Sequence, residues 1–382
     1  MRCRSAKSNR HSPQRTQRTQ RNQLLYKDTI LYIPIFYFQR VSLLLSAAFL
    51  LLSLCPAAGV AAGGITVAAV GDIMMGTDFP RPRLPRKGGR ALLSQAAPLF
   101  AGADIAMANL EGPLLAGGKP AKVAVSGRSY LFRTPPSYAF NLKRAGISMV
   151  SLANNHAMDF GWPGLVSTKR ALEEAGVGFS SKGGEIAEYL VRGVRVGVLS
   201  LSFGQPPRSI VYPAKALEEI AEASGRYDIL ILSIHAGAEG RQALHISPGG
   251  ERFLDEPRGD LISFAHQAID RGADLVVSHG PHVPRAMELY RGRLIAYSLG
   301  NFATFAALSV ARESGYAPLL RAELAPDGAF LNGSIHSFLQ KPRKGPRHDP
   351  KQRAFRLMQR LSAADFPGSR LAFGPSGELT TK

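Results

Sequence analysis

Carboxylate, amide and imidazole side chains follow directly on apolar runs in this sequence. The densest group is SLANNHAMDFG (151–161), in which Asn155, His156 and Asp159 come after the apolar run GISMVSLA (146–153). Polar side chains buried beside such a run lose favourable hydration unless they bond to one another, to a metal ion or to a substrate. The segment is therefore either a turn held by its own side chains or part of a site.

Polar residues end six of the predicted strands in the same way. Each one alone has an ordinary explanation, because an aspartate after a strand usually forms a turn or caps a helix, and a single histidine is usually structural. In an open α/β sheet, however, ligands bind beyond the carboxyl ends of the strands. The recurrence predicts that these side chains meet at one edge. Besides Asn155 and His156, they are Asp72, Glu111, His235 with Glu239, His279 with His282, and Asn301.

The donor types point to a divalent cation. Carboxylate, amide and imidazole groups without thiolates are the ligands of Mn²⁺, Mg²⁺, Fe²⁺ or Zn²⁺. The two cysteines, Cys3 and Cys55, both precede the predicted globular part. That part therefore has no internal disulfide and no thiolate metal site.

The elements that would position these residues alternate between strands and helices. Apolar runs read as strands and amphipathic stretches as helices, several of which end at a glycine. This alternation predicts an α/β layered domain, with a hairpin around Pro326-Asp327-Gly328 at 319–335. The predicted strands are 65–72, 104–111, 147–155, 194–203, 227–235, 274–280 and 292–302, and the predicted helices are 89–102, 136–146, 163–176, 214–223 and 260–272.

The chain divides into a basic N-terminus (1–62), one globular domain (63–340) and a C-terminal tail (341–382). No long linker interrupts the central part. The charge and proline content of QKPRKGPRHDPKQR (340–353) predicts a basic, partly disordered and solvated tail. Within that tail, AFRLMQRLSAA (354–364) is compatible with a short helix.

The formal charge of +19 lies mainly at the two ends. Residues 1–62 carry nine Lys and Arg against one acid, and residues 341–382 carry ten against three. Residues 63–340 are nearly balanced, with 28 against 24. A nucleic-acid partner is therefore not predicted. Basic ends of this kind more often contact a membrane surface, an anionic polymer or nothing specific.

The N-terminus has the pattern of an export signal. The apolar run VSLLLSAAFLLLSLC (41–55) follows Arg40 and leads into the small residues PAAGVAAGG (56–64). This run is shorter than the roughly 18 residues of a membrane-spanning helix. The upstream TILYIPIFYF (29–38) leaves an uncleaved anchor open as an alternative. We expect an exported protein, periplasmic, at the cell surface or secreted, with a cleaved signal peptide or a membrane anchor.

Taken together, the motifs resemble those of the capsule biosynthesis proteins of the CapA type, named for poly-gamma-glutamate production. That family is related in fold to the calcineurin-like metallophosphoesterases. The resemblance implies a four-layer α/β/β/α sandwich. The matching segments are VGDIMMG (70–76), ANLEGPL (108–114), SLANNHAMDFG (151–161), LSIHAGAEG (232–240), ADLVVSHGPHV (273–283) and IAYSLGNF (295–302).

The resemblance also implies a ligand set. Asp72 resembles the first metal-binding aspartate of the phosphoesterases, and Glu111 stands in place of their bridging carboxylate. Met74, however, stands where the phosphoesterase pattern has a histidine. One metal ion, two ions or a metal-free polar pocket thus remain open. The residues similar to the remaining ligands are Asn155, His235, His279 and His282, with His156 beside Asn155.

Two functions follow from the resemblance. In the first, a bound cation assists hydrolysis of a phosphoester or of an amide in an anionic polymer, and His156 donates a proton to the leaving group. Asp159 would orient His156, or else only cap a helix, and Glu239 would act as a general base or support a ligand. In the second, a non-catalytic accessory protein binds or escorts an extracellular polyanion beside a membrane-bound synthase.

Overall fold

The computed structural model describes residues 63–123, 130–306 and 308–382. The predicted signal peptide or anchor and both cysteines lie outside these residues. Within the described part of the chain, no helix combines the length and apolarity needed to cross a bilayer.

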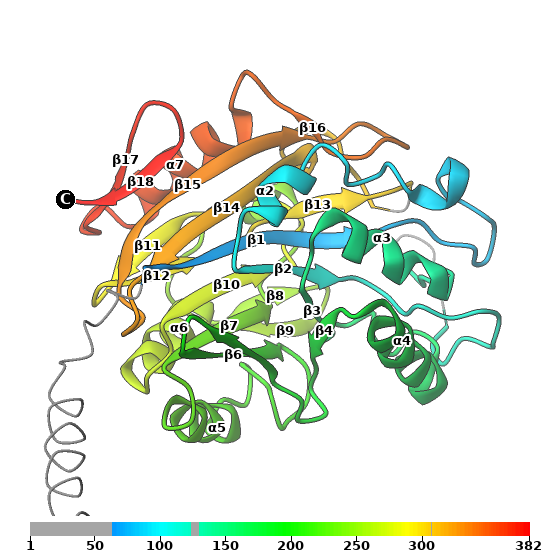
Figure 1. The fold of residues 1–382 in the computed structure, drawn as a ribbon, viewed down its shortest axis with the longest axis horizontal. Coiled ribbons are helices and arrows are strands. Elements are labelled where there is room, and N and C mark those ends of the chain that lie inside the picture. The colour runs from blue at the N-terminus through cyan, green and yellow to red at the C-terminus, as the bar shows by residue number, and fades with distance from the viewer. Residues whose placement is uncertain (1–62, 124–129, 307) are drawn as a thin grey trace, which may run out of the picture. The chain divides into compact units, whose positions relative to one another are not determined.

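Two β-sheets form the inner layers of residues 63–382 (Figure 1). The neighbours β1, β2, β3 and β4 are parallel, whereas β14 and β15 form the predicted antiparallel hairpin. Sheet 1 has the order β17 (Leu371–Phe373), β18 (Glu378–Thr381), β15 (Phe330–Leu339), β14 (Tyr316–Leu324), β1 (Ile65–Met74), β2 (Ile105–Leu110), β3 (Met149–Ser151) and β4 (Gly178–Ser180); β13 (Asn301–Thr304) also pairs with β1, and β16 (Arg347–His348) with β15.

Sheet 2 is smaller and has a parallel centre. Its edge strands β5 and β11 are antiparallel to their neighbours. A separate hairpin of β8 (Glu251–Phe253) and β9 (Glu256–Gly259) follows β7 in the chain. Sheet 2 has the order β11 (Met287–Tyr290), β12 (Arg293–Ala296), β10 (Leu275–His279), β7 (Ile229–His235), β6 (Val194–Ser202) and β5 (Ala187–Val191).

Three hydrophobic clusters separate four layers. The first packs sheet 1 against α2 (Ala97–Ala101), α3 (Ala139–Ala145) and α4 (Gly161–Ala175). The second lies between the two sheets, and the third packs sheet 2 against α5 (Ala214–Ser224) and α6 (Leu261–Asp270). The four-layer α/β/β/α arrangement expected from the resemblance is thereby confirmed.

The direction of successive side chains explains why strands buried on both faces are apolar at nearly every position. Along β1, Val67 and Ala69 enter the inter-sheet cluster, whereas Ala68 and Val70 enter the cluster under the helices. Successive side chains of a strand point to opposite faces, so a strand covered on both sides must be apolar at nearly every position.

The predicted strand 292–302 is wrong as a single element. The chain leaves sheet 2 at the end of β12 and enters sheet 1 as β13, which pairs with β1. Gly300, at φ +58°, makes the turn between them, and its carbonyl oxygen accepts a hydrogen bond from the backbone N–H of Asp72 at 2.8 Å. A Cβ on Gly71 would lie 1.8 Å from that carbonyl oxygen. Two glycines thus allow the backbones to touch where the sheets meet.

The predicted helix 89–102 is also shorter than expected. Only Ala97–Ala101 is α-helical, and residues 90–96 form successive turns. Pro98 lies in the first turn of α2. Proline cannot donate the backbone hydrogen bond of a helix interior and disfavours helical geometry in the residue before it, so it suits the first turn.

The C-terminal segment corrects the predicted domain boundary. Residues 341–382 are not a partly disordered, solvated tail: they form β16, β17, β18 and the helix α7 (Arg353–Asp365). The predicted short helix at 354–364 is confirmed as α7. Phe355 and Met358 join the inter-sheet cluster, and Leu357 and Leu361 join the cluster on the outer side of sheet 2. The many surface charges of this segment conceal its apolar stripe.

We expect Met358→Ala to lower the free energy of unfolding by about 2–5 kcal/mol, because it removes a fully buried side chain from the core. Denaturant unfolding of this variant and of Arg356→Ala measures the effect. Arg356 is exposed on the same helix, so its substitution should change stability by about 0.5 kcal/mol or less. Equal effects of the two substitutions would show that α7 is peripheral.

Candidate metal centre

The predicted site residues lie where the carboxyl ends of strands from both sheets meet. Sheet 1 brings Asp72 on β1 opposite Asn109 on β2, and Asn109 opposite Ser151 on β3. Sheet 2 pairs His235 on β7 with His279 on β10. The site is thus formed between two sheets, whereas the strand pattern alone predicted one sheet edge.

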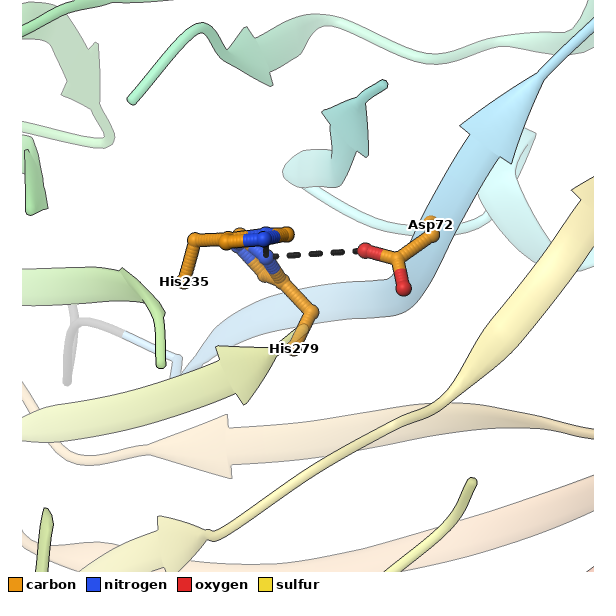
Figure 2. A group of neighbouring side chains, drawn as sticks. All are labelled: Asp72, His235 and His279. Atoms are coloured by element: carbon orange, nitrogen blue, oxygen red, sulfur yellow. Dashed lines mark hydrogen bonds and ion pairs between the residues drawn. The ribbon is translucent and has the colours of Figure 1, made fainter. Parts of the chain in front are cut away.

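Asp72, His235 and His279 form the centre of the site. Each offers one ligand atom, these atoms all lie within 4.8 Å of one another, and all three residues are buried. The two Nδ1 atoms of His235 and His279 are 3.0 Å apart, and His279 Nδ1 lies 3.6 Å from Asp72 Oδ1. Figure 2 shows the carboxylate of Asp72 pointing toward the two imidazoles.

These residues fit a divalent cation. Among the described residues, His235 Nε2 and Glu111 Oε1 are buried without a hydrogen-bond partner. Such atoms are costly to bury unless something binds them. On the far side of the His279 ring, Nε2 contacts Ser233 Oγ at 3.0 Å, which fixes the ring with Nδ1 toward the cluster. Two imidazoles and a carboxylate are a donor set for Zn²⁺, Mn²⁺ or Fe²⁺.

The protonation states favour ligation. Burial lowers the pKa of His279 to about 4, although the charge of Asp72 opposes the change. Burial, followed by the charge of His279, also lowers the pKa of His235 well below its usual value. Both rings are therefore neutral near pH 7, which is the form that binds metals. Burial would raise the pKa of Asp72, but the hydrogen bond and charge of His282 outweigh it and lower that pKa.

Asn109 joins the two carboxylates of the site. Its Nδ2 donates to Asp72 Oδ1 at 2.9 Å and to Glu111 Oε2 at 2.5 Å. Asn154 Nδ2 in turn donates to Asn109 Oδ1 at 2.9 Å. Burial, followed by the charge of Asp72, raises the pKa of Glu111 well above its usual value. The sequence prediction missed the role of Asn109; its position opposite Asp72 in the parallel pairing was the available signal.

Glu111 lies between two histidines. Its Oε2 is 3.8 Å from His235 Nδ1, and its Oε1 is 3.9 Å from His156 Nε2. On the other side of the His156 ring, Nδ1 is 2.8 Å from Asp159 Oδ2, which also accepts the backbone N–H of Phe132 at 2.9 Å. The Phe132 ring packs on His156 with a centroid separation of 4.3 Å. The orientation of His156 is therefore well determined.

His282 reaches the centre through Asp72. Its Nδ1 lies 2.9 Å from Asp72 Oδ2 and 3.0 Å from Asn301 Oδ1, and its Nε2 lies 4.0 Å from Glu239 Oε2. Burial opposes its charge, but the hydrogen bond to Asp72 and the surrounding carboxylates raise the pKa of His282 to about 10. The structure thus gives His282 a contact with the ligand Asp72, and its own role as a ligand stays a prediction.

Two more positions complete the account of the predicted residues. Glu239 forms an ion pair with Arg258 at 2.9 Å, and the Arg258 guanidinium stacks 4.1 Å above the Phe203 ring. Sequence reasoning missed Arg258, because its place beside Glu239 depends on the β8–β9 hairpin. Asn155 Oδ1 is buried without a partner among the described residues, and its backbone carbonyl accepts from Lys122. No hydrogen bond or ion pair joins the Asn155 side chain to the other described residues of the centre, so its role as a ligand also stays a prediction.

With this geometry in view, the family can be assigned. The model of the bacterial capsule synthesis protein family, PGA_cap, matches residues 66–305. The chain belongs to this family. Its matched region contains Asp72, Glu111, His156, His235 and His279.

Several relatives of this chain carry names that refer to polymer synthesis. The capsule biosynthesis protein CapA of Bacillus anthracis is 27% identical over 62% of this chain and 59% of its own length. The PGA biosynthesis protein CapA of Bacillus subtilis is 28% identical over 62% and 63%. A probable polyglutamine synthesis accessory protein of Mycobacterium tuberculosis is 30% identical over 52% and 55%. The chain therefore spans less than two thirds of these relatives.

Two solved structures align with much of this chain at low sequence identity. A 5'-nucleotidase precursor from Thermus thermophilus aligns with a TM-score of 0.40 and 14% identity, over 78% of this chain and 58% of that chain. The calcineurin-like phosphoesterase YfkN from Bacillus subtilis aligns with a TM-score of 0.39 and 15% identity, over 79% and 98%.

We expect Mn²⁺ or Zn²⁺ to stabilise the protein against unfolding. A ligand that binds only the folded state contributes about 2.7 kcal/mol at a free concentration about 100 times its dissociation constant. Thermal unfolding and bound-metal analysis should show the gain in the wild type and its loss in Asp72→Asn. As a control, Asp327→Asn alters an exposed turn and should respond like the wild type. Equal stabilisation of Asp72→Asn would place the metal elsewhere.

Proposed function

We propose that this PGA_cap family member is a divalent-metal-dependent hydrolase that acts on an anionic polymer or a phosphoester during capsule-polymer synthesis. The observation that carries the proposal is the buried group of Asp72, His235 and His279, with Glu111 and His156 beside it. The names of the relatives support the polymer, and the donor set supports the metal.

The residues of the chain divide the work of such a reaction. Asp72, His235 and His279 would hold the cation, which when bound polarises the scissile oxygen and lowers the pKa of a water molecule. Asp159 would accept the Nδ1–H of His156 and fix the ring, so that the imidazolium form presents its Nε2–H to the leaving group and becomes a neutral imidazole after the transfer. Phe132 keeps bulk water from one face of that ring.

Glu239 is better suited to positioning than to proton abstraction. Its ion pair with Arg258 stabilises the carboxylate and restrains its side chain. The same carboxylate faces His282, which contacts Asp72. We assign Glu239 the role of holding His282 against Asp72.

The second candidate is a non-catalytic accessory protein that binds or escorts a polyanion beside a membrane-bound synthase. The relative from Mycobacterium tuberculosis is named as a synthesis accessory protein, and Met74 stands where the phosphoesterase pattern has a histidine. Both candidates include export, which rests on the sequence of residues 29–64 and places the polymer partner outside the cytoplasm.

We expect His156→Gln to lower the hydrolysis rate by roughly 10²–10⁴-fold while bound metal is retained, because proton transfer is lost but the ligands stay. Turnover of poly-glutamate and of a chromogenic phosphodiester measures the rate. His245→Gln is the matched control, since His245 forms a similar pair with Asp365, at 2.6 Å, outside the site. Polymer binding without any turnover by the wild type would favour the accessory role.

A further inference from the structure

A basic groove of about 1070 Å³ lies outside the metal centre. One wall is the segment after β1, from Pro82 to Leu92, and the other is the connection between β15 and β16. Residues 348–351 and Arg353, before and at the start of α7, complete the lining. The second wall belongs to the segment that composition alone predicted to be a solvated tail.

Positive side chains line both walls. Arg83 and Arg86 project from the first wall, and both are exposed. The second wall carries four exposed cations in a short stretch, which are Lys341, Arg343, Lys344 and Arg347.

Two further cations, Lys351 and Arg353, stand near the start of α7 and also line the groove. Among the described residues of the lining, Asp349 is the only acidic one, and its carboxylate pairs with Arg353 at 2.8 Å and accepts the backbone N–H of the same residue. Among the described residues, the other seven cations of the groove make no ion pair. These like charges on both walls give the groove a positive potential, which attracts an anionic partner.

The walls are fixed to one another by the backbone. A Cβ on Gly345 would lie 2.0 Å from the carbonyl oxygen of Leu92, so the two segments touch at this glycine. The backbone N–H of His348 donates to Gln95 Oε1 at 3.0 Å. The groove is therefore built into the fold of residues 80–95 and 340–353.

One strand connects the groove with the metal centre. Asn301, at the start of β13, contacts His282, and Phe305, just past its end, lines the groove. Four residues of strand span about 13 Å. The groove is thus a separate site, close enough for one long ligand to extend toward the catalytic edge.

We propose that this groove binds an extended polycarboxylate chain of the polyglutamate kind, a role that rests on the polymer substrate of the proposed function and assigns it a second binding site. A polyglutamate chain carries one free carboxylate per residue, so an extended chain can bring carboxylates to both basic walls. Single-stranded nucleic-acid sites combine cations with several aromatic rings for base stacking. In the part of the chain that the structure describes, the groove offers only the rings of Phe305, which is half-buried against the core, and His348.

The test is binding of labelled poly-glutamate to the full-length chain, followed by fluorescence anisotropy at low and high salt. Reversing one charge on the first wall and two on the second, in Arg86→Glu/Lys341→Glu/Lys344→Glu, should weaken binding at least tenfold. Lys215→Glu/Arg226→Glu/Arg271→Glu changes the net charge equally at exposed positions elsewhere and should weaken it less than about threefold. Melting temperature and bound metal should stay at wild-type values in both triple variants.

Asp72→Asn separates this proposal from the proposed function. It should lose metal and hydrolysis but bind poly-glutamate as the wild type does. If the wild type shows no hydrolysis but its polymer binding still depends on the groove, the proposed hydrolase function is refuted and the groove proposal stands. Wild-type affinity in the groove variant would refute the groove. So would equally tight, groove-dependent binding of duplex DNA or of phosphatidylglycerol vesicles, because the site would then select charge and not a polycarboxylate chain.

Discussion

The site depends on the burial of two carboxylates, Asp72 and Glu111, within reach of the same amide. Neither is exposed to water, and a buried pair of like charges is unfavourable unless protons, hydrogen bonds or a cation compensate it. Asn109 provides a hydrogen bond to each, and His282 provides one more to Asp72. A bound cation would offset the negative charge of both carboxylates.

The buried carboxylates and imidazoles come together because the two sheets pack face to face. Sheet 1 contributes the carboxylates and amides, and sheet 2 contributes His235 and His279. Gly71 and Gly300 permit the backbones to approach where the chain passes from one sheet to the other. The distance between the acidic and the imidazole halves of the site is therefore set by main-chain contacts.

Much of this was accessible from the sequence. Apolar runs ending in polar residues predicted β1, β2, β3, β7 and β10 and the residues that meet beyond them, and Pro326-Asp327-Gly328 predicted the hairpin. Those signals are local. Three features depend instead on which strands become neighbours, and local patterns in one sequence do not reveal strand neighbours. They are the passage of the chain from β12 to β13 and the roles of Asn109 and Arg258.

The C-terminal segment was misjudged for a different reason. Its charges and prolines are typical of solvated chain, but the apolar positions of α7 face both the inter-sheet cluster and the outer cluster of sheet 2. Net composition averages over faces and so hides a stripe of this kind. The same charges, placed on one side of an ordered loop, produce the basic groove.

The strand order of sheet 1 also affects when the domain can finish folding. On one side β1 pairs with β2, but on the other it pairs with β13 and β14, so that Ile65 stands opposite Leu324. Contacts so distant in the chain form slowly, because a long loop must close first. During synthesis, the edge of β1 that pairs with β14 has no partner in sheet 1 until Tyr316–Leu324 has been made. A chain that stopped before β14 would leave Ile65–Val70 unpaired along this edge, and an unpaired strand edge promotes aggregation.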